Sequence, residues 1–250
     1  MSDFNRGYAR TIPADRADMS VDAGLRTFML GVYNKVALGL VVSAALAFVT
    51  GQVEPVRDLL YRTTVDGRLI GYTIPGMIVA FGPLAVMLFG AFGMRNATPR
   101  SSGIYYWTIV SLMGASLGAI TMLYTGASLA STFLITAAAF GALSLVGYTT
   151  KKDLTGFGSF LVIGLFGLVI ASIVNIFLMN SMMNFIISIL GVGIFAGLTA
   201  YDTQRLKMTY YELGGNQSAM GVATNYGALS LYLDFLNLFM FLLRLLGDRR

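Results

Sequence analysis

Long uncharged segments are the feature that most constrains the fold of this chain. Residues 127–150 contain no Asp, Glu, Lys or Arg. Of the 250 residues, 56% are hydrophobic and 12% are charged, whereas soluble domains carry roughly a quarter charged residues. A bilayer is therefore expected to cover these faces. Seven windows have the length and composition of membrane spans: 28–50, 74–94, 104–124, 127–149, 157–179, 182–204 and 225–246.

The windows predict helices, because lipid offers no hydrogen bonds to the backbone and only helices or closed barrels satisfy it there. Barrel strands alternate in hydrophobicity, and these windows do not. Residues that break helices lie in the gaps, for example Gly51 to Pro55 and the pair Gly214-Gly215. We predict an all-α membrane protein, in which residues 28–250 form a seven-transmembrane helical bundle and residues 1–27 form a cytoplasmic tail.

The distribution of basic residues predicts the orientation. With the N-terminus in the cytoplasm, about ten Lys and Arg lie on the inner side and about six on the outer side. These residues flank the apolar windows and form no single basic patch, so we expect no nucleic-acid binding despite the net charge of +5. The predicted location is therefore a cellular membrane, crossed several times, with the N-terminus inside.

Two absent residue types restrict the chemistry. The chain has no cysteine, which excludes disulfides, thiolate catalysis and Cys-ligated metals. It also has no histidine, so any proton sensing near neutral pH must come from carboxylates in unusual surroundings. We expect no bound cofactor.

Asp202 and Asp234 lie inside predicted membrane helices. An ionisable side chain is costly there, so each of the two is a candidate functional residue. From a rise of about 1.5 Å per residue, Asp202 lies about 17 Å before the turn at Gly214-Gly215, and Asp234 about 14 to 22 Å after it. The two helices are antiparallel, so the carboxylates can share one level. Two carboxylates in an apolar site do not both ionise cheaply, and they are expected to share a proton.

This pair would form a switch that responds to pH. Loss of the shared proton would leave two repelling anions, which would push the helices apart or admit a cation. The alternative is that each aspartate simply bonds a neighbouring Asn, Tyr or Thr. Arg95, at the cytoplasmic end of the second helix, is the best-placed cation for the pair, or else an interfacial arginine. Small residues inside the helices indicate positions where helices pack closely: Gly114, Gly118, Gly191, Gly193 and Gly197.

The sequence around the two aspartates resembles the Bax inhibitor-1 family, the transmembrane BAX inhibitor motif proteins. The segments that carry the resemblance are Tyr201–Gln204 (YDTQ), Ala228–Arg244 (ALSLYLDFLNLFMFLLR), Val32–Leu40 (VYNKVALGL), Lys151–Leu154 (KKDL) and Asn175–Phe177 (NIF). The similarity extends from about residue 28 to the C-terminus. The short ending 247–250 resembles bacterial members, so we expect a protein of the bacterial inner (cytoplasmic) membrane.

The resemblance implies a bundle with the last helix at its centre and the other six around it. It also implies a pH-sensitive calcium leak gated by an aspartate dyad, with Asp202 and Asp234 as gating and weak calcium-binding residues and Arg95 as their partner. Some relatives carry an acidic residue within the second helix, whereas residues 74–94 contain none, which leaves the ion route open.

Other functions were weighed against the cation leak. Bacterial relatives resemble modulators of a membrane-anchored AAA protease in membrane-protein quality control, and residues 1–27 would then be the contact. An intramembrane aspartyl protease also uses two aspartates, but its Gly-x-Gly-Asp motif is replaced here by Tyr232-Leu-Asp234. A retinal photoreceptor needs a lysine in the seventh helix, which is absent. We therefore expect a protein that is not an enzyme.

Overall fold

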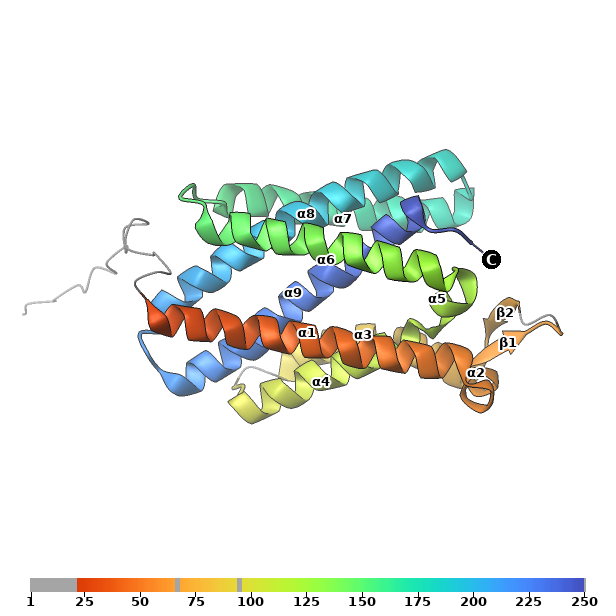
Figure 1. Cartoon of the computed structure of the whole chain (residues 1–250), viewed down its shortest axis with the longest axis horizontal. Helices are drawn as coiled ribbons and strands as arrows, with labels where there is room; N and C mark the ends of the chain where they lie inside the picture. Colours follow the sequence, from red (N-terminus) through yellow and green to blue (C-terminus); the bar gives the residue numbers. More distant parts are fainter. Residues whose placement is uncertain (1–21, 66–67, 94–95, 250) are drawn as a thin grey trace, which may run out of the picture.

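The computed structural model describes residues 22–65, 68–93 and 96–249. These residues form helices joined by short turns, with one small hairpin (Figure 1). The elements in chain order are α1 (Ala23–Gln52), α2 (Glu54–Leu60), β1 (Tyr61–Thr63), β2 (Leu69–Tyr72), α3 (Ile74–Gly93), α4 (Pro99–Ser116), α5 (Gly118–Leu123), α6 (Gly126–Thr149), α7 (Thr155–Leu178), α8 (Ser181–Glu212) and α9 (Gln217–Leu246).

The prediction of an all-α membrane protein is confirmed. Six helical segments of the described residues are long and apolar enough to cross a bilayer, and 74–90 of α3 forms a shorter apolar helix. A count of seven spans therefore stays a prediction. Two details differ from the expected windows: the third is divided at Leu117 into α4 and α5, and the loop 51–73 contains α2 and the antiparallel pair β1–β2.

Polar side chains at the helix starts explain where several helices begin. The Asp22 carboxylate accepts hydrogen bonds from the backbone N–H groups of Gly24 and Leu25, both at 2.9 Å, so α1 begins at Ala23. Residues 23–27, which the sequence assigned to the tail, thus form the start of α1. At α4, Thr98 and Ser101 bond each other's backbone N–H groups in a capping box.

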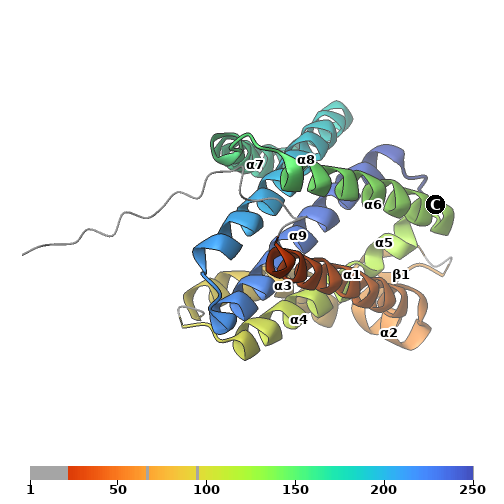
Figure 2. The same ribbon diagram turned by 60° about the vertical axis from the view of Figure 1, so that its left-hand side comes forward.

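Helix α9 is the most buried of the long helices. Half of its apolar window is buried, compared with 17–33% in the others. It packs against α1, α4, α6 and α8, and it crosses between α1 and α8 in both ribbon views (Figures 1 and 2). Helices α3 and α7 pack mainly on α4 and α8, respectively. The last helix is therefore central, with four helices directly around it and two further out.

Hydrogen bonds fix the position of α9 against α1 and α4. The Tyr232 and Ser43 hydroxyls are 2.6 Å apart, and Ser43 donates to the Val110 carbonyl at 3.1 Å. One turn earlier on α4, the Tyr106 hydroxyl donates to the carbonyl of Lys35 at 2.6 Å. These contacts satisfy polar groups that would be costly in an apolar interior, and they hold the face of α9 that carries Asp234 toward α8.

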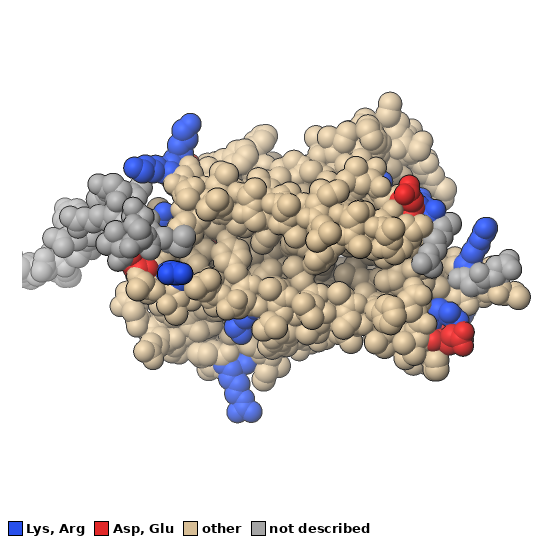
Figure 3. Space-filling model, in the orientation of Figure 1, with Lys and Arg blue, Asp and Glu red and all other residues tan. Residues whose placement is uncertain are grey.

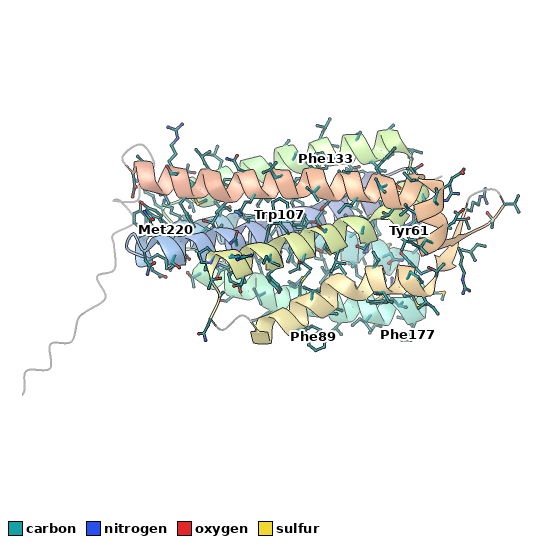
Figure 4. All side chains as sticks on the ribbon, turned by 90° about the horizontal axis from the view of Figure 1, so that it is seen from below. Tyr61, Phe89, Trp107, Phe133, Phe177 and Met220 are labelled. Carbon is teal, nitrogen blue, oxygen red and sulfur yellow. The ribbon has the colours of Figure 1, made fainter. Side chains whose placement is uncertain are left out.

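The outer surface has the character expected in lipid. Charged side chains gather toward the two ends of the bundle, and most of the surface between them is uncharged on the face shown (Figure 3). Large apolar side chains point outward along this region, including Phe89 and Phe177, which are 77% and 80% exposed (Figure 4). A soluble protein rarely exposes apolar surface on this scale.

Close helix contacts occur at four of the five predicted packing glycines. A Cβ atom added at Gly114 or Gly118 would lie within 3.0 Å of backbone atoms of α1. At Gly191 and Gly197 it would lie within 2.7 Å of side chains packed against α8. Gly193 has open space around it, so the packing interpretation is wrong for this residue.

Candidate functional site

Asp202 and Asp234 lie on α8 and α9, the pair of helices with the most extensive contact in the bundle. Each is only 6% exposed. The turn between the helices contains Gly214 and Gly215 at φ values of 55° and 86°, a backbone region that glycine adopts without a steric penalty. The chain can thus reverse sharply, and α9 returns antiparallel along α8.

Contacts between the helices bring the two aspartates together. Ser230, one turn before Asp234 on α9, donates a hydrogen bond to Asp202 Oδ2. Asp202 and Arg205 are the charged groups that interact with Asp234. The level shared by the two carboxylates, estimated from their distances to the turn, is therefore seen in the structure.

Arg205 supplies the positive charge at this site. Its Nη2 atom lies 3.3 Å from Asp202 Oδ1 and donates to the Ser230 hydroxyl at 3.2 Å. The guanidinium side chain is 49% exposed, whereas the Asp202 side chain is 8% exposed. The arginine thus reaches the buried carboxylate from the edge of the bundle and keeps part of its surface outside.

The environment of Asp234 differs from that of Asp202. Its Oδ2 atom is buried and has no hydrogen-bond partner among the described residues. When both carboxylates are ionised, two negative charges face one arginine, and the second negative charge is uncompensated. A bare buried charge costs several kcal/mol, so this site requires either a proton or a further cation.

Arg95, the predicted partner of the pair, lies outside the described residues. Arg205 is one of the basic residues that the sequence predicts on the inner side of the membrane, and the sequence assigns it no role in the site. The spacing between Asp202 and Arg205 was nevertheless a usable signal, since residues three apart share one face of a helix. Ser230 gave no comparable signal, because its partner lies on another helix.

Gln204 anchors the loop beside the site. Its side-chain amide is 8% exposed; it donates to the carbonyl of Lys152 and accepts from the N–H of Leu154, both at 2.8 Å. In the same loop, hydrogen bonds from the side chain and backbone of Thr155 lower the pKa of Asp153 below its ordinary value. The loop before α7 is thus bonded to α8 at Gln204.

Lys207 is a buried cation that the sequence did not single out. It is 7% exposed, and its ammonium group donates to the Tyr148 carbonyl on α6 at 3.0 Å. The ammonium also lies 5.2 Å from the centre of the Tyr148 ring. Lys207 therefore connects α8 with α6 near the end of both helices.

The site offers few ligands for a metal ion. Calcium takes roughly six to eight oxygen atoms, and no cluster of three or more acidic side chains occurs among residues 22–65, 68–93 and 96–249. Asp202, Asp234 and the Ser230 hydroxyl provide a partial shell. Such an arrangement suits brief contact with a partly hydrated cation better than tight storage.

The chain is similar to proteins of several bacteria. The family model described as "Inhibitor of apoptosis-promoting Bax1" matches residues 25–250. An uncharacterized protein of Caulobacter vibrioides is 66% identical over 250 residues and 100% of both chains. Uncharacterized protein RP147 of Rickettsia prowazekii is 41% identical, covering 97% of this chain and 98% of its own. Inner membrane protein YbhL of Escherichia coli is 38% identical, covering 91% and 94%, respectively.

Proposed function

Because this chain belongs to the Bax inhibitor-1 family, we propose that its bundle is a pH-sensitive calcium leak of the bacterial inner membrane, gated by Asp202 and Asp234. The name of the Escherichia coli relative supports the membrane assignment. The excess of basic residues on one side supports a cytoplasmic N-terminus. The charges of Asp202, Asp234 and Arg205 at the α8–α9 interface support the gate.

The observation that carries the proposal is the uncompensated second carboxylate. Arg205 lies 3.3 Å from Asp202, while Asp234 Oδ2 is buried with no hydrogen-bond partner in the described part of the chain. At low pH a proton neutralises the extra charge, and the α8–α9 interface stays closed. At higher pH the proton leaves, and the negative charge either separates the helices or attracts a cation from the membrane edge.

Calcium is the proposed cation because it is divalent and prefers oxygen ligands. The two carboxylates and the Ser230 hydroxyl would replace only part of its hydration shell. Binding would then be weak enough for the ion to leave again, as conduction requires. The proposal does not need a preformed cage, and the sparse ligand set supports a leak more than a store.

The direct test is calcium flux from liposomes that contain the purified full chain and a calcium indicator. We expect efflux to increase as the pH rises from about 5 to about 8, because loss of the shared proton would leave two repelling carboxylates at the α8–α9 interface. Empty liposomes give the background, and sodium, potassium and proton fluxes measure selectivity. Calcium flux equal to the background at every pH would exclude the proposal.

Replacing Arg205 by glutamine is expected to move the midpoint of the pH response upward by roughly one unit. The guanidinium, 3.3 Å from Asp202, offsets negative charge at the site, so without it the second negative charge of the pair should form only at higher pH. The expected change in the midpoint is small because the arginine side chain is half exposed and its charge is partly screened by solvent. Flux against pH measures it.

The matched control is Arg205→Lys, which keeps the positive charge and should restore most of the normal midpoint. If Arg205→Gln and the unmodified chain respond at the same pH, Arg205 has no part in setting the charge of the gate.

A further inference from the structure

A hollow opens between α1 and α6 at the end of the bundle where α1 begins. In the described part of the chain, α1 packs against α4, α5 and α9, and α6 packs against α8 and α9, but α1 and α6 do not pack closely on each other. The hollow has a volume of about 370 Å³, and its lining includes Arg26, Met29, Tyr33, Phe140, Gly141 and Ser144. It does not include Asp202 or Asp234.

A second hollow lies farther along the same pair of helices, α1 and α6. The second hollow, of about 500 Å³, is lined by apolar side chains that include Leu40 and Ala47 of α1 and Leu129 and Phe133 of α6. The space-filling view shows this face hollowed between the two helices (Figure 3). Arg26 and Ala47 lie about 31 Å apart along α1, close to the thickness of the hydrocarbon core. The two hollows, which we call the α1–α6 groove, therefore follow a membrane-spanning helix, the direction in which acyl chains extend.

A buried hydroxyl in the first hollow lacks a partner. Ser144 is 5% exposed, lines the hollow, and its Oγ atom has no hydrogen bond with any described residue. Most buried polar groups in folded proteins are paired. An unpaired donor beside an empty apolar volume indicates a ligand that brings an acceptor with it.

The end of the hollow is basic. The exposed guanidinium of Arg26 has no ion pair with the described residues. The Asp22 carboxylate, on the preceding turn, accepts hydrogen bonds from Gly24, Leu25 and Tyr210. Lys151 and Lys152 follow the end of α6, and Asp153 comes after them. Positive charge at the membrane edge attracts anionic headgroups.

We propose that this groove is a binding site for one anionic phospholipid of the surrounding bilayer. An acyl chain lies along the apolar wall between α1 and α6, and the headgroup phosphate pairs with Arg26. Ser144 lies one helical turn deeper than Tyr148, the residue of α6 at the end of the hollow. Its hydroxyl donates to a glycerol ester carbonyl, which in a phospholipid lies below the phosphate.

The site can be filled without disturbing the fold. A Cβ atom added at Gly141 has nothing within 4 Å, so the leucine of Gly141→Leu enters the hollow instead of a neighbouring helix. Gly167→Leu is the matched control: Gly167 lies on α7, away from the groove, and also has nothing within 4 Å.

The experiment measures lipid binding to the purified full chain in detergent, with dioleoyl phosphatidylglycerol and dioleoyl phosphatidylcholine as probes, by native mass spectrometry and thermal stability. We expect phosphatidylglycerol to bind about tenfold tighter than phosphatidylcholine, because the choline cation of phosphatidylcholine offsets the attraction between its phosphate and Arg26. Gly141→Leu should lose this binding about tenfold, and Gly167→Leu should keep it. Arg26→Gln, a change at an exposed position, should make the two lipids equivalent.

Three results would overturn the proposal. Equal binding of both lipids by the unmodified chain would remove the role of charge. Normal phosphatidylglycerol binding by Gly141→Leu would place the lipid elsewhere. Glycerol phosphate has no acyl chains. If it competed at the same concentration as the lipid, the site would bind only the headgroup and no acyl chain. None of these results depends on ion flux, so this proposal and the proposed gate can fail separately.

Discussion

Exchanging both Asp202 and Asp234 for asparagine is expected to remove the pH-dependent part of the calcium flux. Asparagine has nearly the shape of a protonated aspartate but cannot ionise. The α8–α9 interface would then carry no carboxylate charge at any pH, so it could not gain the second negative charge that opens it in our proposal. We expect flux at the alkaline end to fall at least about tenfold, which corresponds to only about 1.4 kcal/mol between the two states.

The measurement is liposome flux at acid and alkaline pH for the unmodified chain, each single variant and the double variant. Asp234→Asn alone should have almost the full effect, because Asp202 keeps its arginine. Asp153→Asn is the matched control, since hydrogen bonds from Thr155 keep the pKa of Asp153 low. Asp153 therefore stays ionised throughout this range, and its loss should leave the shape of the pH response unchanged.

Unchanged pH dependence in the double variant would reject the aspartate gate, even if the protein still conducted ions. A protein that conducts strongly at all pH values after the exchange would also reject it. In that case the carboxylates would hold the bundle closed by their hydrogen bonds, and their ionisation would not open it.

The second large effect is expected in stability, at the contact between α1 and α4. A Cβ atom at Gly114 would lie 2.5 Å from the Cα atom of Ser43. A side chain could relieve such a contact by changing rotamer, whereas a helix backbone cannot. Gly114→Leu should therefore separate the two helices and break the hydrogen bonds of Ser43 with Val110 and Tyr232. We expect a loss of at least about 3 kcal/mol.

Thermal unfolding in detergent, followed by circular dichroism, and the yield of monodisperse protein measure this loss. Gly193→Leu is the control, because the same added side chain at Gly193 meets open space. A Gly114→Leu protein with normal thermal stability would show that the close approach of α1 and α4 is not required for folding.

Much of the architecture was predictable from local composition. The windows of uncharged residues agree closely with the helices; for example, 127–149 corresponds to α6, Gly126–Thr149. The breakers agree as well, since Gly214 and Gly215 form the turn between α8 and α9. These features are predictable because the bilayer requires continuous apolar helices. Charged and helix-breaking residues end those helices locally, within a few residues of their own position.

The details of the 51–73 segment were not predictable in the same way. It forms α2 and a two-stranded hairpin in which Tyr61 is opposite Tyr72. Outside the hydrocarbon, a short segment can satisfy its backbone groups with water, turns or strands. Its composition of mixed charges and apolar residues therefore does not select one of them.

The sequence by itself determined that this is a membrane bundle, and that Asp202 and Asp234 lie at similar depths in consecutive antiparallel helices. Only the tertiary structure decided which groups meet them: Ser230 and Arg205 beside Asp202, and no hydrogen-bond partner for Asp234 Oδ2 among the described residues. It also decided that α1 and α6 leave a groove between them. The physical reason is that these helices are apolar around most of their circumference. Their composition therefore fixes depth in the bilayer but not rotation about the helix axis, which is set by close packing with neighbouring helices.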